Sequence, residues 1–119
     1  MLKDANSFSH IYLRCGRTDM RLGIDGLLTV ISGTMQLDPT QPGSIFLFCG
    51  HKKDRIKALI FEGDGWLLCY KRLTGNCSYQ WPKDEIEARL LTQQQFRWLM
   101  EGLSIEQKKV IKDTKPDIF

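Results

Sequence analysis

The sequence has little that would mark a membrane, secreted or metal-binding protein. No uncharged stretch approaches the roughly 18 apolar residues that a membrane-spanning helix needs. The polar residues 1–9 contain no apolar segment of the kind found in secretion signals. The four cysteines, Cys15, Cys49, Cys69 and Cys77, form no CxxC pair of the kind typical of zinc and redox sites. We therefore expect free thiols, no metal, no cofactor, no contact with a membrane and a cytoplasmic location.

Sequence patterns of catalysis are also missing. The Gly-Asp-Gly run at residues 63–65 is too short for a nucleotide-binding loop and precedes an expected strand instead of a helix. The acidic residues show no spacing that gathers them around a pair of metal ions. We expect a protein without enzymatic activity. A remnant nuclease site is a minor alternative, and it would use Asp19, Asp25 or Glu62.

Length and composition fit one globular domain with a basic middle. The chain has 119 residues, of which 42% are hydrophobic and 26% are charged, close to ordinary globular averages. We expect a single domain over residues 1–119, with its core at about residues 10–104 and a polar helical tail at 105–119. The net charge is only +3, yet residues 44–83 carry seven basic and three acidic side chains. Such an excess is either a footprint for an anionic polymer or an ordinary solvated face.

The first part of the chain predicts a strand followed by an amphipathic helix. Residues 11–15 are short, β-prone and followed by glycine, which is typical of a strand. Thr18 stands where a helix N-cap would, and Asp19 suits the first turn of that helix. Apolar residues then recur at helical spacing over about four turns, at Met20, Ile24, Leu27, Leu28, Ile31 and Met35. Several glycines lower the helix propensity, so packing must hold this helix.

Strands are expected in the middle of the chain. Each is a short apolar or alternating run, and the connections between them are short and rich in turn residues. These lengths fit hairpins, so the strands should form an antiparallel meander. The expected strands are residues 44–49, 55–62, 66–73 and 77–81.

The end of the chain predicts helices. Thr92 and Gln95 form a capping-box pattern, and their helix should run to about Glu101, with Gly102 as its stop. Ser104 begins a second such pattern, so a further polar helix is expected. The expected fold class is α+β: an antiparallel β-meander with an N-terminal amphipathic helix packed on it and one or two C-terminal helices. The core should contain Ile24, Leu27, Ile31, Phe46, Phe48, Leu59, Phe61 and Leu68.

Basic residues interleaved with aromatics are the one pattern that points to a ligand. Basic side chains crowd the expected hairpin at residues 52–57, and Lys71 and Arg72 end the next strand. Trp66 and Trp81 lie nearby in the sequence. On an antiparallel sheet, cations can reach phosphates while an aromatic ring supports a base or sugar. The same pattern also fits core aromatics beside cations that only keep a sheet edge soluble.

A family resemblance runs along nearly the whole chain. The motif T-D-M-R-x-G-I-D-G-L occupies residues 18–27, and Y-K-R-L occupies residues 70–73. Together with D-R-I-K at residues 54–57 and G-D-G-W at residues 63–66, these motifs are specific in combination. The chain resembles the small TnpB-type (Orf2) transposition accessory proteins of the insertion-sequence sixty-six group, over roughly residues 10–104. That family is distinct from the larger RNA-guided nucleases that share the name TnpB.

The sequence departs from the family pattern at two places. His51 lies in a stretch where relatives often carry arginines, which weakens the expected phosphate contact there. Phe61 stands where many relatives show tryptophan, which indicates a position used for packing.

The resemblance implies a bacterial accessory factor for the transposition of an insertion sequence. It implies no catalysis, because cutting and joining in this family are assigned to a separate, larger transposase, the expected protein partner. DNA, at the element ends or the target, is the other expected partner, bound through a basic sheet surface. The competing interpretation is an assembly module that bridges transposase subunits without touching DNA; exposed Trp66 and Trp81 would favour it. The residues expected to bind DNA are Arg14, Arg17, Arg21, Lys52, Lys53, Arg55, Lys57, Lys71 and Arg72.

Overall fold

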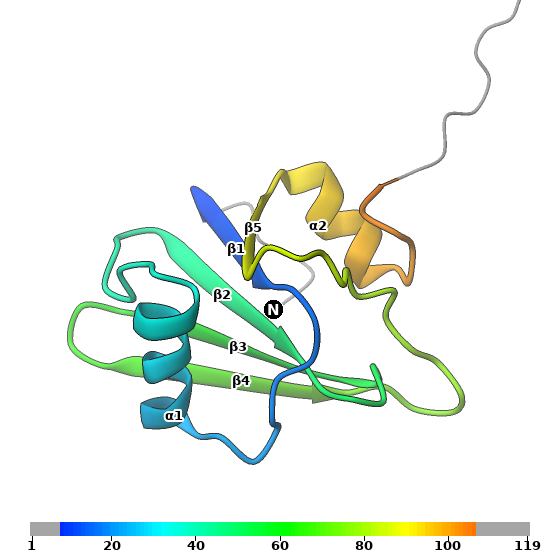
Figure 1. Cartoon of the computed structure of the whole chain (residues 1–119), viewed down its shortest axis with the longest axis horizontal. Coiled ribbons are helices and arrows are strands. Elements are labelled where there is room, and N and C mark those ends of the chain that lie inside the picture. The colour runs from blue at the N-terminus through cyan, green and yellow to red at the C-terminus, as the bar shows by residue number, and fades with distance from the viewer. Residues whose placement is uncertain (1–7, 107–119) are drawn as a thin grey trace, which may run out of the picture.

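The computed structural model describes residues 8–106, which form a five-stranded sheet with helical segments on both faces (Figure 1). The expected α+β class is confirmed. The strands are β1 (His10–Arg14), β2 (Ser44–Cys49), β3 (Arg55–Phe61), β4 (Trp66–Arg72) and β5 (Ala88–Leu91). The helices are α1 (Ile24–Thr29), which continues into the π-helical turn η1 (Val30–Thr34), and α2 (Gln93–Met100).

Strand β2 lies at the centre of the sheet, in the order β4-β3-β2-β1-β5. It is a continuous apolar run and is buried along its whole length, as expected for a strand covered on both faces. β1 runs parallel to β2, with Ile11 opposite Ile45, whereas the other neighbouring pairs are antiparallel. A parallel pair needs a long crossover connection, and residues 15–43 supply it with α1 and η1.

The expectation of an N-terminal helix on a purely antiparallel sheet is therefore wrong. α1 follows β1, and the sheet is mixed. The hairpins β2–β3–β4 form as expected, but residues 77–81 are not a strand. Tyr79 and Trp81 are instead buried among the apolar side chains of one sheet face, because these large rings remove more apolar area from water there than at a sheet edge. The fifth strand is β5, which pairs with the outer side of β1.

The first helix begins at Ile24, later than the N-cap signal at Thr18 predicts. The Thr18 amide donates to the carbonyl of Cys49 at 2.8 Å, and its hydroxyl accepts from Arg14 at 3.3 Å. Thr18 is thus attached to the end of the sheet and caps nothing. Gly23 occupies the N-cap position, and no side chain caps the helix there.

Two apolar clusters stabilise the fold, one on each face of the sheet. On one face α1 and η1 pack on β2 and β3. On the other face α2 and residues 79–81 pack on β1, β2 and β3. The predicted core is confirmed at Leu27, Ile31, Phe46, Phe48 and Leu59, which are fully buried. Ile24, Phe61 and Leu68 are only half-buried and lie at the rim of the first cluster or beside it.

Helix α2 forms as its capping pattern predicts. The Thr92 side chain accepts from the Gln95 amide at 3.0 Å, and the Gln95 side chain accepts from the Thr92 amide at 2.9 Å. Gly102 follows the helix with φ +85°, a left-handed conformation that favours glycine. The further polar helix expected from Ser104 lies mostly outside the described residues. Within residues 8–106, no helix is long and apolar enough to cross a membrane.

The four cysteines are free and differ in exposure. Cys15 and Cys49 are buried, Cys69 is half-buried and Cys77 is exposed. Burial raises the pKa of the Cys49 thiol to about 12, which keeps it in the unreactive thiol form.

We expect two kinetic classes of thiol when the folded protein is treated with a disulfide reagent at pH 8. Cys77 should react rapidly because it is exposed, whereas Cys15 and Cys49 should react only after unfolding. Spectrophotometric thiol counting with and without denaturant measures both classes. Replacing Cys77 with serine should remove the rapid class, and a rapid class that persists in this variant would contradict the assignment.

Candidate functional site

Most of the basic residues of the middle segment meet at one end of the sheet. Strands β1, β2 and β4 finish there and β3 and β5 begin there, as the pairs Cys49–Ile56 and Arg55–Arg72 show. The loops at residues 15–23, 50–54 and 73–87 extend from this end. We call this end of the sheet the basic end. Its cations are the Lys and Arg side chains at residues 14–21, 52–57, 71–72 and 83.

Lys57 has a structural task at the basic end. Its ammonium group donates to the backbone carbonyls of Met20 at 2.9 Å and Leu22 at 2.8 Å. It also lies 5.6 Å from the centre of the Tyr70 ring. These contacts attach the segment before α1 to the sheet and leave Lys57 little capacity for an external anion.

Arg14 and Arg21 are also occupied by partners within the chain. Arg14 donates to the Thr18 hydroxyl and forms an ion pair with Glu87 at 3.4 Å. Arg21 pairs with Asp19 at 2.9 Å, and its hydrogen bonds lower the pKa of the Asp19 carboxyl to about 2. Both arginines therefore have a carboxylate partner within 4.0 Å.

Arg55 and Arg72 lie directly opposite each other on β3 and β4. Like charges in this position destabilise a strand pair. Asp54 offsets part of the repulsion, since its carboxylate lies 3.4 Å from Arg55. Such a local conflict is typical of a functional surface, where an external anion relieves it.

The remaining cations have no carboxylate partner among the described residues. They contrast with Arg14, Arg21, Arg55 and Arg89, each of which lies within 4.0 Å of an acidic side chain. This pairing pattern divides the predicted DNA-binding residues into a structural group and an available group. The available group is Arg17, Lys52, Lys53, Lys71 and Arg72, and Lys83, absent from the sequence prediction, joins it.

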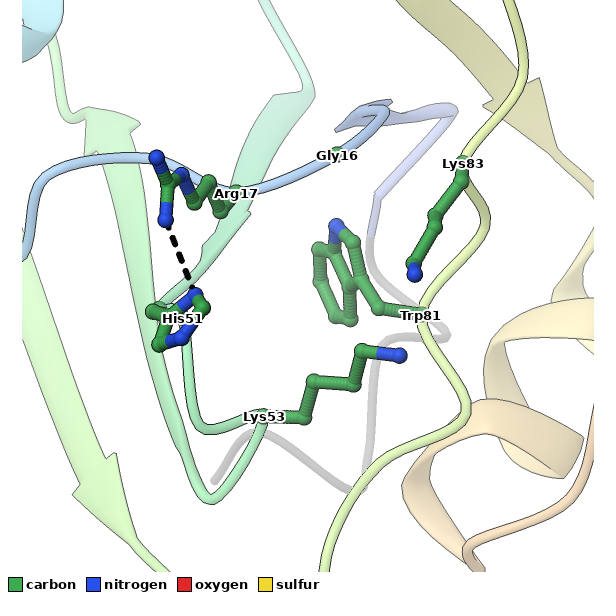
Figure 2. A pocket seen from close by; sticks show the side chains of 7 residues that line it. Gly16, Arg17, His51, Lys53, Trp81 and Lys83 are labelled. Carbon is green, nitrogen blue, oxygen red and sulfur yellow. Dashed lines mark hydrogen bonds between the residues drawn. The ribbon is translucent and has the colours of Figure 1, made fainter.

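A pocket of about 310 Å³ opens among these available cations. It is lined by Arg17, His51, Lys53, Trp81 and Lys83, with the backbone of two glycines, and no acidic side chain lines it. Figure 2 shows the Trp81 indole between the Arg17–His51 pair and the ammonium groups of the two lysines. The residues come from three loops that are far apart in the sequence.

Hydrogen bonds fix the walls of the pocket. The Trp81 indole N–H donates to the carbonyl of Arg14 at 2.8 Å. The Arg17 guanidinium, which can only donate, lies 2.9 Å from Nδ1 of His51. No carboxylate takes part in this contact, so the charge of Arg17 is not compensated.

The loop at residues 50–54 holds Lys53 in a strained conformation. Its φ is +63°, a left-handed value that non-glycine residues adopt infrequently. The Lys53 carbonyl accepts from the Tyr79 amide at 2.7 Å, which ties the loop to the segment carrying Trp81. Strain of this kind is found preferentially at binding sites.

The alternative nuclease site gains no support from the arrangement of the carboxylates. Asp19 is bound to Arg21 and Asp25 is in the first turn of α1. Glu62 lies in the β3–β4 turn, at the opposite end of the sheet from Asp19. Among residues 8–106, no three side chains of the metal-binding types lie close enough to hold an ion.

The sequence prediction counts Lys83 in the basic middle segment but not among the DNA-binding residues, and it does not bring Trp81 to Arg17. The signal for both is the run Trp81-Pro82-Lys83, an aromatic next to a cation. Residues 77–81 are expected as a strand, whereas in the structure they form a loop that carries Trp81 to the pocket.

Comparisons with known proteins agree with the resemblance found in the sequence. The family model described as "IS66 Orf2 like protein" matches residues 9–110. The chain is 29% identical to the uncharacterised protein y4hO of Sinorhizobium fredii (strain NBRC 101917 / NGR234), over 78% of this chain and 79% of that protein. It is 28% identical to the uncharacterised protein y4jC of the same strain, over 82% and 84%. No solved structure gives a significant match. The chain belongs to the IS66 Orf2-like family of transposition accessory proteins.

Proposed function

We propose that this protein serves transposition by binding DNA through phosphate groups at the basic end of the sheet. The observation that carries the proposal is the gathering of unpaired cations there, while the other cations of the same region have carboxylate or carbonyl partners. Phosphate contacts supply most of the affinity of proteins for DNA. The proposed contacts are made by Arg17, Lys52, Lys53, Lys71, Arg72 and Lys83. The protein partner is the separate transposase of the same element, which performs the chemistry.

The structure does not favour the assembly-module interpretation. That interpretation called for exposed tryptophans, because aromatic anchors are enriched at protein interfaces. Trp81 is only 5% exposed, and Trp66 is half-buried with its ring 4.6 Å from that of Phe61. Neither ring offers a large free surface to a partner protein.

Binding to a duplex with element-end sequence should be strongly salt-dependent. If each of the six proposed cations neutralises one phosphate charge, log affinity should fall with log salt with a slope of about −5.4. Replacing Lys53 and Lys83 with alanine should reduce the magnitude of that slope by about two. Fluorescence anisotropy from low to physiological salt measures the slope.

The matched control is Arg97→Gln, because Arg97 is an exposed cation on α2, bonded to Gln94. This variant should keep the wild-type slope. All variants must retain the wild-type melting temperature. Absence of wild-type binding at low salt would remove the DNA proposal. A reduction of about one in the slope of Arg97→Gln, the same per cation as at the basic end, would show that the basic end is not the interface.

A further inference from the structure

We infer that the pocket formed by Arg17, His51, Lys53, Trp81 and Lys83 binds the terminal phosphate monoester of a DNA end. This inference rests on the proposed DNA binding and goes beyond it. It assigns the pocket to one chemical group, the phosphate that ends a strand, in place of the diesters that run along it.

Charge is the first argument for a monoester. A phosphate monoester carries about −1.5 to −2 charges at neutral pH, whereas a diester carries one. Arg17, Lys53 and Lys83 bring three cationic side chains to one pocket, and no carboxylate lines it. The neighbouring hollow of about 510 Å³ differs, because Asp19 and Asp54 line it beside its cations. Half of the available cations therefore line the pocket proposed here, and they share it with no carboxylate.

Shape is the second argument. The pocket is a concavity between three loops, with the Trp81 indole as one wall. A diester within a strand has sugars on both sides, so it passes most easily across an open surface. A terminal phosphate has a sugar on one side only and can enter such a concavity with its three free oxygens directed at several donors.

The pocket is also prepared before a ligand arrives. Trp81 is buried and held by the Arg14 carbonyl, and Lys53 is held in a left-handed conformation by the loop bonded to Tyr79. Apolar wall surface beside the cations lowers the local dielectric and strengthens their attraction for an anion. The Trp81 ring and the Lys53 backbone are therefore in place before binding, and the ligand has only the lysine side chains to order.

The experiment compares duplexes of one sequence that differ only at the strand end. They carry a 5′-phosphate, a 3′-phosphate or hydroxyls at both ends, with an internal dye for anisotropy. We expect a phosphorylated end to bind about tenfold or more tightly than the hydroxyl duplex, the gain of a few charge-assisted hydrogen bonds. The difference between the 5′ and 3′ arms identifies the end that is bound. Equal affinity for all three duplexes would overturn the inference while leaving DNA binding intact.

Two variants locate the effect. Lys83→Gln should abolish the preference for the phosphorylated end, because Lys83 lines the pocket. Lys52→Gln is the matched control: Lys52 is a neighbouring exposed cation that does not line this pocket, so it should weaken all duplexes alike. Loss of the preference in both variants, at unchanged melting temperature, would show that the pocket is not its source.

Absence of binding for all three duplexes would overturn the pocket inference together with the proposed function. The free nucleotide tests the pocket separately from the duplex: titration calorimetry with thymidine 5′-monophosphate should show binding that Lys83→Gln removes. No heat with this probe would overturn the pocket inference and leave the proposed DNA binding intact. Inorganic phosphate that competes as well as a phosphorylated duplex would assign the site to free phosphate and overturn the assignment to DNA ends.

Discussion

Truncating Leu27 to alanine should lower the free energy of unfolding by about 2–5 kcal/mol, the usual range for a buried leucine. Leu27 is 0% exposed and lies where α1 packs on Phe46, Phe48 and Leu59. The helix contains Gly26 and has no side-chain cap, so its own propensity is low and packing must hold it. The cavity left by the truncation therefore weakens the main force that keeps α1 on the sheet. Urea unfolding followed by far-UV circular dichroism measures the loss.

Leu90→Ala is the matched control for this prediction. Leu90 lies on the edge strand β5 and is 57% exposed, so the same chemical change should cost no more than about 0.5 kcal/mol. Equal losses in the two variants would show that α1 does not depend on its buried face.

Replacing Lys57 with methionine should lower the free energy of unfolding by about 1.5–3 kcal/mol, the range for hydrogen bonds to a charged group. The variant keeps the aliphatic length of the side chain but removes both bonds to the carbonyls of Met20 and Leu22. The segment before α1 would lose its attachment to β3, and two carbonyls would lose their donor. The same urea titration provides the measurement.

Lys52→Met separates this structural role from a general effect of charge. Lys52 is exposed in the loop at residues 50–54, so its replacement should leave stability within about 0.5 kcal/mol of wild type. We expect the opposite order in DNA binding, with the larger change in salt slope for Lys52→Met. If Lys57→Met is as stable as wild type and reduces the slope, Lys57 belongs with the available cations after all.

Local patterns predicted the elements whose partners are close in sequence. The β2–β3–β4 hairpins follow from short turns between strand-like runs, and α2 follows from the reciprocal bonds of Thr92 and Gln95. β5 was not found, because its four residues carry no strong alternation and it is stabilised by pairing with β1 far away in the chain. The predicted start of α1 was wrong because the sequence suggests Thr18 as a helix N-cap. In the structure the Thr18 amide instead donates to the carbonyl of Cys49, which only the folded sheet brings within reach.

The candidate site shows the same division. The sequence located the basic excess at residues 44–83 and most of the cations of the basic end. It did not distinguish available cations from occupied ones. Glu87, the ion-pair partner of Arg14, is 73 residues away in the chain, and the Met20 carbonyl that accepts from Lys57 is 37 residues away. Neither partner can be recognised before the elements that carry them pack together.

The sequence by itself determined the α+β class, the hairpins, the second helix, the apolar residues at the centre of the core and the family. The family follows from the resemblance of motifs along the chain. The other features follow from interactions between near neighbours or from the period of the apolar residues, which the chain carries wherever it folds. Only the tertiary structure decided that β1 runs parallel to β2, that Trp81 lies in a pocket beside Arg17 and Lys83, and which cations remain unpaired. Those features depend on contacts between residues distant in the chain, and such contacts exist only once burial of both sheet faces has fixed the order of the strands.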